Sequence, residues 1–204
     1  MSANESPLLS KVDQLRAELR TRNPQQLAFQ TATSFQEGAH GGAFHFPYWG
    51  KEVILSSRDF LPRSVESGEP LAVIHQAIIA YYFHTSKGSP PAQGWISFSE
   101  LPDGQFYTAA FQSYTGKKIL QSFGADYAGF ESRCRDICGK SVKFGDGAYQ
   151  FQVLPRAAVL TVYWRGDEDF PPSYKVLFED TINYHLPTDG CAILGSMLTG
   201  KLIS

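Results

Sequence analysis

The sequence has few of the features from which a protein's chemistry is usually inferred. Its three cysteines, Cys134, Cys138 and Cys191, are an odd number, which argues against a disulfide framework and fits a reducing cytoplasm. Lysine and arginine total 18 against 20 aspartates and glutamates, so the chain lacks the basic excess of a nucleic-acid-binding protein. No apolar run approaches the roughly 18 residues of a membrane-spanning helix. The N-terminus has no apolar core of the kind found in signal peptides.

Recognised catalytic motifs are also missing. The chain contains no HExxH, G-x-S-x-G, P-loop or G-x-G-x-x-G sequence. Cys134 and Cys138 are four residues apart on an expected helix, but a zinc site needs two further ligands and no CxxC pair supplies them. We therefore expect these two cysteines to share a helix face as small, partly buried side chains.

Aromatic side chains are abundant. The chain of 204 residues has 15 Phe, 10 Tyr and 3 Trp, within a composition that is 43% hydrophobic and 19% charged. This composition is typical of a globular protein and not of a disordered one. So many rings must fill a core, line a ligand pocket, or do both.

Periodicity predicts a single α+β domain spanning residues 1–204, in which helices within 1–32 pack on the α+β body. Asn23 followed by Pro24 predicts a capped helix start. No internal repeat or linker divides the chain. We expect one mostly antiparallel sheet covered by helices, with strands in residues 42–56 and 140–178 and helices in residues 71–87 and 104–138.

The stretch WRGDEDFPPS, Trp164–Ser173, follows an apolar strand and carries three acids. Gly166 permits a turn, and Asp167 to Asp169 are residue types common in turns. We expect Phe170 to anchor this loop to the core. The stretch is therefore predicted to be a structured acidic turn, with a calcium or magnesium site as the alternative.

A dispersed set of aromatic, histidine and arginine side chains forms the candidate ligand site. If they converge, they make a pocket with aromatic walls and imidazole nitrogens, which suits cobalamin or haem. His185 and His45 are the candidate metal ligands. Arg156 and Arg165 are candidates for holding a carboxylate, either on the acidic turn or on a ligand. The alternative is that most of the rings are core. The candidate residues are His45, Trp49, Trp95, Tyr107, Tyr114, Arg156, Tyr184 and His185.

Three long runs carry a family resemblance: GWISFSELPDGQFYTAAFQ, VLPRAAVLTVYWRGDEDFPPSYKVLFEDT and YHLPTDGCAILG. They resemble the prokaryotic family catalogued as domain of unknown function 3786 (DUF3786). The resemblance implies a cytoplasmic protein of bacteria or archaea, common in anaerobes, with some relatives fused to a corrinoid-protein-type iron–sulfur domain. This chain lacks the four-cysteine cluster of that domain, so no iron–sulfur cluster is expected.

Three functions stay open from the sequence. The favoured one is a cofactor-binding or cofactor-handling protein with a corrinoid or another tetrapyrrole as ligand and a corrinoid or iron–sulfur protein as partner. The second is an enzyme that uses His45 or His185 with an acidic partner for acid–base chemistry. The third is a protein-interaction domain without a small ligand.

Overall fold

The computed structural model describes residues 5–38, 41–92 and 94–204. Contacts divide the chain into two compact units, and the chain enters each of them more than once. The prediction of a single domain over residues 1–204 therefore stays a prediction. The first unit contains Met1–Pro90, Val153–Ala157 and Tyr184–Gly190, and the second contains Pro91–Gln152, Ala158–Asn183 and Cys191–Ser204.

The first unit begins with two helices, α1 (Glu5–Leu19) and α2 (Pro24–Thr31). The predicted cap is confirmed, because the Asn23 side chain accepts a hydrogen bond of 3.0 Å from the Gln26 amide. A third helix, α3 (Val73–Thr85), packs against α1. The buried face of α1 consists of Val12, Leu15 and Leu19, which follow helical spacing.

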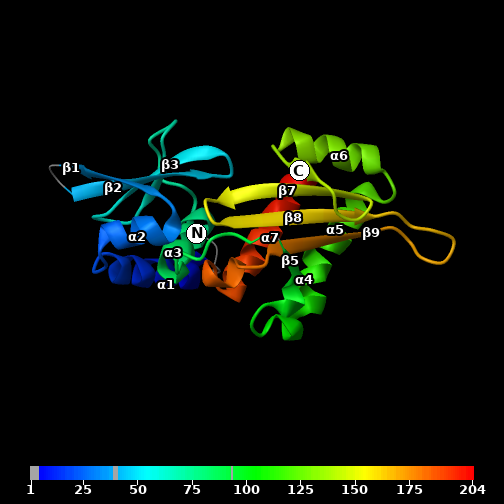
Figure 1. Ribbon diagram of the computed structural model, residues 1–204, viewed down its shortest axis with the longest axis horizontal. Coiled ribbons are helices and arrows are strands. Elements are labelled where there is room, and N and C mark those ends of the chain that lie inside the picture. Colours follow the sequence, from blue (N-terminus) through cyan, green and yellow to red (C-terminus); the bar gives the residue numbers. More distant parts are fainter. Residues whose placement is uncertain (1–4, 39–40, 93) are drawn as a thin grey trace. The chain divides into compact units, whose positions relative to one another are not determined.

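The first sheet is antiparallel, with strand order β1-β2-β3-β4. Alternate residues of β2 point to opposite faces, so Phe44 and Phe46 are buried while His45 between them is only half-buried. The buried face packs on α3, where the rings of Phe44 and Phe83 lie 5.0 Å apart. Figure 1 shows the helices of this unit on one side of the sheet. The strands are β1 (Ser34–Gly38), β2 (Gly41–Tyr48), β3 (Lys51–Ser56) and β4 (Pro62–Ser64).

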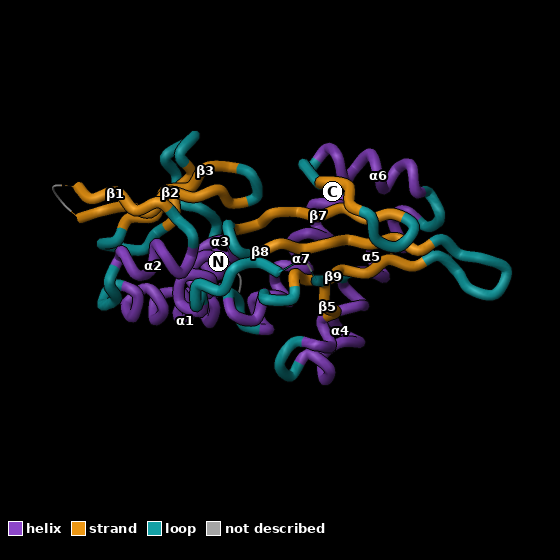
Figure 2. Tube along the Cα trace, in the orientation of Figure 1, coloured by secondary structure: helices purple, strands orange, loops and turns teal. Residues whose placement is uncertain are grey.

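The second sheet has strand order β5-β9-β8-β7-β6. Its longest strands form the apolar centre of the second unit, and β8 is buried at every residue except Trp164. Each sheet forms its own group of strands in Figure 2. The strands are β5 (Trp95–Ser97), β6 (Lys140–Val142), β7 (Gly147–Leu154), β8 (Ala157–Trp164) and β9 (Ser173–Glu179).

Helices of the second unit pack on the face of this sheet that carries Phe178. Phe111 stacks on Phe98 with ring centroids 4.2 Å apart and also contacts Phe178. Gly195 of the C-terminal helix lies so close to the Phe111 ring that a Cβ atom would come within 2.6 Å of it. The helices are η1 (Phe98–Glu100), η2 (Gly104–Tyr107), α4 (Thr108–Tyr114), α5 (Gly116–Phe123) and α6 (Tyr127–Asp136). Two further elements, η3 (Ile182–Tyr184) and α7 (Thr188–Ile203), contribute residues to both units.

The α+β class and the antiparallel pairing are confirmed, but the single sheet predicted from residues 42–56 and 140–178 is wrong. The strands of the first segment pair with β1 and β4 and not with those of the second segment. Hairpins bring consecutive strands together first, so each group of strands is completed by its sequence neighbours. Pro62, which has no N–H to donate, lies on the edge strand β4, as expected for proline in a sheet.

The helices predicted within residues 104–138 form as several short segments. Tyr107 lies in η2 with 63% of its surface exposed, whereas Phe111 on α4 is fully buried. The prediction that Cys134 and Cys138 share a helix face is wrong. Cys134 is buried in α6, but Cys138 follows the end of that helix with a φ of 62° and is exposed. The two cysteines therefore do not share a face. None of the helices in the described part of the chain is long and apolar enough to cross a membrane.

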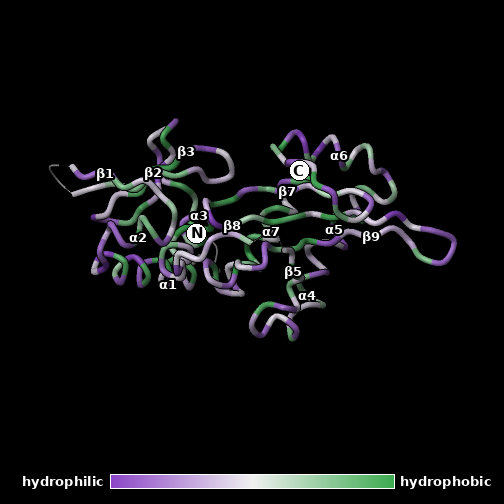
Figure 3. The backbone as a smooth tube through the Cα atoms, in the orientation of Figure 1, coloured by the Kyte–Doolittle hydropathy of each residue, from purple (hydrophilic) through white to green (hydrophobic). Residues whose placement is uncertain are grey.

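The acidic stretch between β8 and β9 is a structured turn, as predicted. The Asp167 carboxylate accepts hydrogen bonds from the amides of Asp169 (2.9 Å) and Phe170 (2.7 Å), and the Asp167 amide donates to the Phe170 carbonyl (2.8 Å). Figure 3 shows this loop largely in the hydrophilic colour. The expected anchoring role of Phe170 is wrong, because these bonds close the turn on itself and leave the ring 70% exposed.

Replacing Asp167 with alanine is expected to lower the free energy of unfolding by about 1 kcal/mol, because two backbone donors lose their acceptor. Glu168→Ala removes one carboxylate from the same turn without removing a hydrogen bond and is expected to stay within about 0.5 kcal/mol. Urea denaturation of both variants measures the difference. Equal effects would contradict the role of these hydrogen bonds. A calcium-dependent rise in the melting temperature of the wild type that both variants lose would show that the turn is a metal site instead.

Candidate functional site

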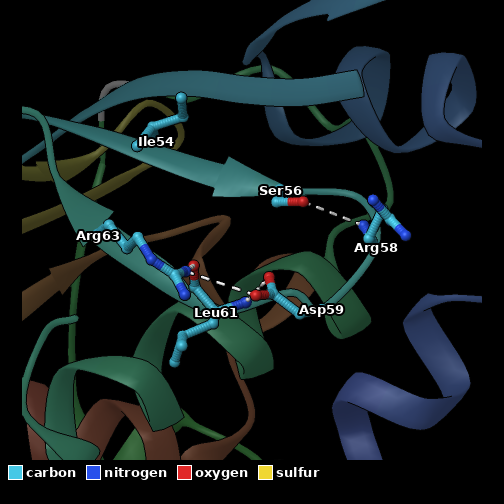
Figure 4. Close-up of a pocket in the computed structure, with 6 residues that line it drawn as sticks. All are labelled: Ile54, Ser56, Arg58, Asp59, Leu61 and Arg63. Atoms are coloured by element: carbon cyan, nitrogen blue, oxygen red, sulfur yellow. Dashed lines mark hydrogen bonds and ion pairs between the residues drawn. The ribbon is translucent and has the colours of Figure 1, made fainter. Parts of the chain in front are cut away.

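A surface hollow of about 450 Å³ lies in the first unit, where β3 ends and the chain turns into β4 (Figure 4). The volume is within the range of about 300–1,000 Å³ that small-molecule sites have. Apolar side chains of Ile54 and Leu61 lie in it together with two arginines and one aspartate. The lining residues are Ile54, Ser56, Arg58, Asp59, Leu61 and Arg63.

The loop that carries the hollow is fixed by Phe60. Its ring is buried next to Phe44 and Phe83, at centroid distances of 5.9 and 6.4 Å, and its amide donates to the Ser56 carbonyl. The Phe60 carbonyl accepts a hydrogen bond of 3.1 Å from the Arg16 side chain of α1. Because the Phe60 backbone is held at both its amide and its carbonyl, the neighbouring side chains of Asp59 and Leu61 have a defined position.

Of the charged side chains in the hollow, Asp59 and Arg63 are paired with each other, whereas Arg58 is not paired with either. Asp59 accepts from the Leu61 amide at 2.9 Å and lies 3.5 Å from the Arg63 guanidinium, which also donates to the Leu61 carbonyl at 3.2 Å. The Arg58 guanidinium has no hydrogen-bond or ion-pair partner in the described part of the chain. Figure 4 shows Arg58 joined to Ser56 only through its backbone nitrogen. Two cations and one anion leave the hollow with one net positive charge.

His45 lies beside this hollow, which the sequence alone did not reveal. In the sheet it is directly opposite Ile54, and Ile54 is in turn opposite Arg63. Side chains of directly paired residues extend on the same face, with Cβ atoms about 4.5–5.5 Å apart. The His45 imidazole therefore belongs to the face of the sheet that the helices leave uncovered.

His185 lies elsewhere in the first unit and is fully buried. Its Nε2 donates to the Ser89 carbonyl at 3.0 Å, and its Nδ1 accepts from the Ser86 hydroxyl at 3.3 Å. A carbonyl can only accept, which assigns the proton to Nε2. Burial lowers the pKa of His185 to about 4, the Ser89 hydrogen bond opposes this, and the charge of Arg156 adds to it. Both ring nitrogens are occupied within the protein.

Arg156 and Tyr82 belong to the same buried network. The Arg156 guanidinium donates to the Ser89 carbonyl at 3.1 Å, and its amide donates to the Tyr82 hydroxyl at 3.0 Å. That hydroxyl donates in turn to the Thr31 carbonyl at 2.7 Å. Arg156 thus binds backbone carbonyls of its own unit, which explains its position without a ligand.

Two of the predicted aromatics, Trp49 and Tyr184, belong to the first unit. Trp49 lies in the turn between β2 and β3, where its amide donates to the Val153 carbonyl at 3.0 Å, and Tyr184 is partly exposed with the Lys87 ammonium 5.8 Å from its ring centre. The other three predicted aromatics belong to the second unit. Trp95 packs on an apolar cluster around Leu177, Tyr107 is exposed, and Tyr114 contacts the edge of Phe111 at 5.6 Å.

Two histidine contacts were missed in the sequence. His84 lies 2.8 Å from the Glu18 carboxylate, and His75 shares a hydrogen bond of 2.8 Å with the Tyr48 hydroxyl. The only sequence signal was the position of each histidine on α3, since its partner lies on a distant element. Among residues 5–38, 41–92 and 94–204, no group of three or more histidines, cysteines, aspartates and glutamates is arranged to hold a metal ion.

A comparison with protein families finds a match over most of the chain. The family model described as "Domain of unknown function (DUF3786)" matches residues 23–201 of the chain. Searches of curated proteins and of solved structures find no match to this chain.

Proposed function

The chain belongs to the family described as domain of unknown function (DUF3786), and we propose that it binds a small-molecule cofactor of the tetrapyrrole class, cobalamin or haem. The proposal locates the ligand on the uncovered face of the first sheet, at the hollow between β3 and β4. The observation that carries it is the position of His45 directly opposite Ile54, which lines that hollow.

The residues present fit such a ligand in two respects. A tetrapyrrole holds its own metal through its ring nitrogens, so the protein would need to contribute one ligand to that metal and not a cluster of metal-binding side chains. His45 offers an imidazole, and Ile54 and Leu61 offer apolar contact for the ring. When bound, the cofactor would supply one-electron or radical chemistry, while the chain holds and orients it.

His45, and not His185, would hold the metal of the cofactor. Both nitrogens of the His185 ring already take part in hydrogen bonds, and coordination would break one of them inside a buried site. His45 is half-buried and lies on an open sheet face. In the second candidate function, acid–base catalysis, a histidine needs a carboxylate partner, and His84 has one in Glu18, at 2.8 Å.

The proposal extends to the setting of the protein. We place it in the cytoplasm of an anaerobe, with a corrinoid or iron–sulfur protein as the partner that delivers or receives the cofactor. The three cysteines support this, since none of them forms a disulfide and Cys134 and Cys191 are buried as free thiols.

Titration of anaerobically purified protein with hydroxocobalamin and with haemin tests the proposal by absorption spectroscopy. We expect the wild-type protein to shift the absorption bands of at least one of them, and His45→Ala to abolish the axial-ligand shift and weaken binding about tenfold. His84→Ala removes a histidine from the same unit away from the hollow and is the matched control. Unchanged spectra of the wild-type protein with both cofactors would overturn the proposal.

A further inference from the structure

We propose that Arg58 is the anion-binding residue of the hollow, that it takes a carboxylate or phosphate group of the ligand, and that Asp59 limits how strongly this group is held. The inference rests on the proposed function for the identity of the whole ligand, but the anion site can be tested separately.

The geometry gives the two arginines different roles. Arg63 is bound on two sides, to the Asp59 carboxylate and to the Leu61 carbonyl, and its side chain is about 35% exposed. It therefore shapes the wall of the hollow. Arg58 presents its guanidinium without a partner in the described residues, and a guanidinium binds carboxylate or phosphate through two parallel hydrogen bonds.

The backbone and the methylene groups of Arg58 are held in place, whereas its guanidinium is available to bind an anion. Its amide donates to the Ser56 hydroxyl at 3.3 Å. Its methylene groups pack against Gly41, where the Cγ atom would lie 3.1 Å from a Cβ atom at that position. A stem held in this way leaves less conformational freedom to be lost when an anion binds.

The net charge of the hollow defines the class of ligand. One unneutralised cation beside the apolar side chains of Ile54 and Leu61 fits a molecule that joins an apolar body to a peripheral acidic group. The propionates of haem and the phosphate of cobalamin both satisfy this description, as does free inorganic phosphate. All three ligands offer an anionic oxygen group to Arg58, and the titrations below distinguish between them.

Substitution of Asp59 is expected to tighten anion binding, whereas substitution of Arg58 is expected to weaken it. Asp59→Asn keeps the oxygen that accepts from the Leu61 amide but removes the negative charge, which releases Arg63 and leaves two unneutralised cations. We expect this variant to bind inorganic phosphate at least about threefold more tightly than wild type, because a repulsive charge has become neutral. Arg58→Gln is expected to bind it at least about fivefold more weakly, and Arg58→Lys to lie in between.

The measurements are titrations with inorganic phosphate, followed by the NMR signals of the arginine side chains, and with haemin, followed by absorption. Arg165→Gln is the control, since it removes one exposed arginine from the acidic loop of the second unit with the same change in net charge. Circular dichroism verifies that each variant is folded, and Arg58→Lys replaces Arg58→Gln if the latter is not.

The outcomes separate the two proposals. Weaker phosphate and haemin binding by Arg58→Gln, with tighter phosphate binding by Asp59→Asn, supports both. If phosphate binding follows Arg58 but no tetrapyrrole binds, the anion site stands and the proposed cofactor function fails. If haemin binds Arg58→Gln as it binds wild type, and phosphate binding by Arg58→Gln equals that by Arg165→Gln, the role of Arg58 is wrong. Weaker phosphate binding by Asp59→Asn overturns the proposed role of Asp59, because Asp59 would then act through structure alone.

Discussion

Replacing His185 with alanine is expected to lower the free energy of unfolding by about 2–4 kcal/mol at neutral pH. The side chain is fully buried, so its removal leaves a cavity. It also leaves the Ser86 hydroxyl without its imidazole partner and removes one of two donors from the Ser89 carbonyl. Chemical denaturation measures the loss. His84→Ala, in which a half-exposed histidine is removed from α3, is the control and should cost about 1 kcal/mol or less.

The lowered pKa of His185 predicts how the stability of the protein depends on pH. Burial, the largest cause, lowers the pKa of His185 to about 4 from the ordinary value of 6.5, so folding favours the neutral ring. The contribution of this residue is therefore fully present above pH 6.5 and is lost as the pH falls from 6.5 toward 4. Denaturation between pH 7 and pH 4 should show the difference between wild type and His185→Ala shrinking. A difference that stays constant over this range would contradict the buried neutral imidazole.

A spectroscopic readout separates this structural role from metal binding. If His185 only ties residues 86–89 to the unit, the absorption bands of any bound tetrapyrrole stay unchanged in His185→Ala. A shift of those bands in a variant of undiminished stability would make His185 the axial ligand and remove His45 from that role.

The second large effect is expected for Ile78→Ala, at about 2–5 kcal/mol. Ile78 is fully buried in α3, and alanine leaves a cavity that the surrounding helices and sheet fill only in part. Ile74 is one turn earlier on the same helix but only half-buried, so Ile74→Ala should cost clearly less. Both variants are compared by urea denaturation. A loss well under 1 kcal/mol for Ile78→Ala would mean that the buried face of α3 is assigned wrongly.

Local features of this fold could be predicted from sequence because their causes are local. Asn23 and Pro24 specify a helix start through side-chain and ring geometry within a few residues. Alternation in AFHFPY separates Phe44 and Phe46 from His45, because side chains of a strand point to opposite faces. Asp167 binds amides two and three residues ahead, so its turn needs no distant partner. The α+β class follows from such elements taken together.

The tertiary structure alone decided which elements meet. Two sheets form where one was predicted, because pairing partners are chosen by competition among many strands of similar apolar character. The hollow was missed, because Arg58, Asp59 and Arg63 form no motif and become a charged cluster only when the turn after β3 is folded. His185 was recognised as important, but its role depends on Ser86 and Ser89, which lie nearly 100 residues away in the chain. A buried polar group forms hydrogen bonds with the partners that the completed fold brings close to it, and these partners cannot be identified from residue spacing in the sequence.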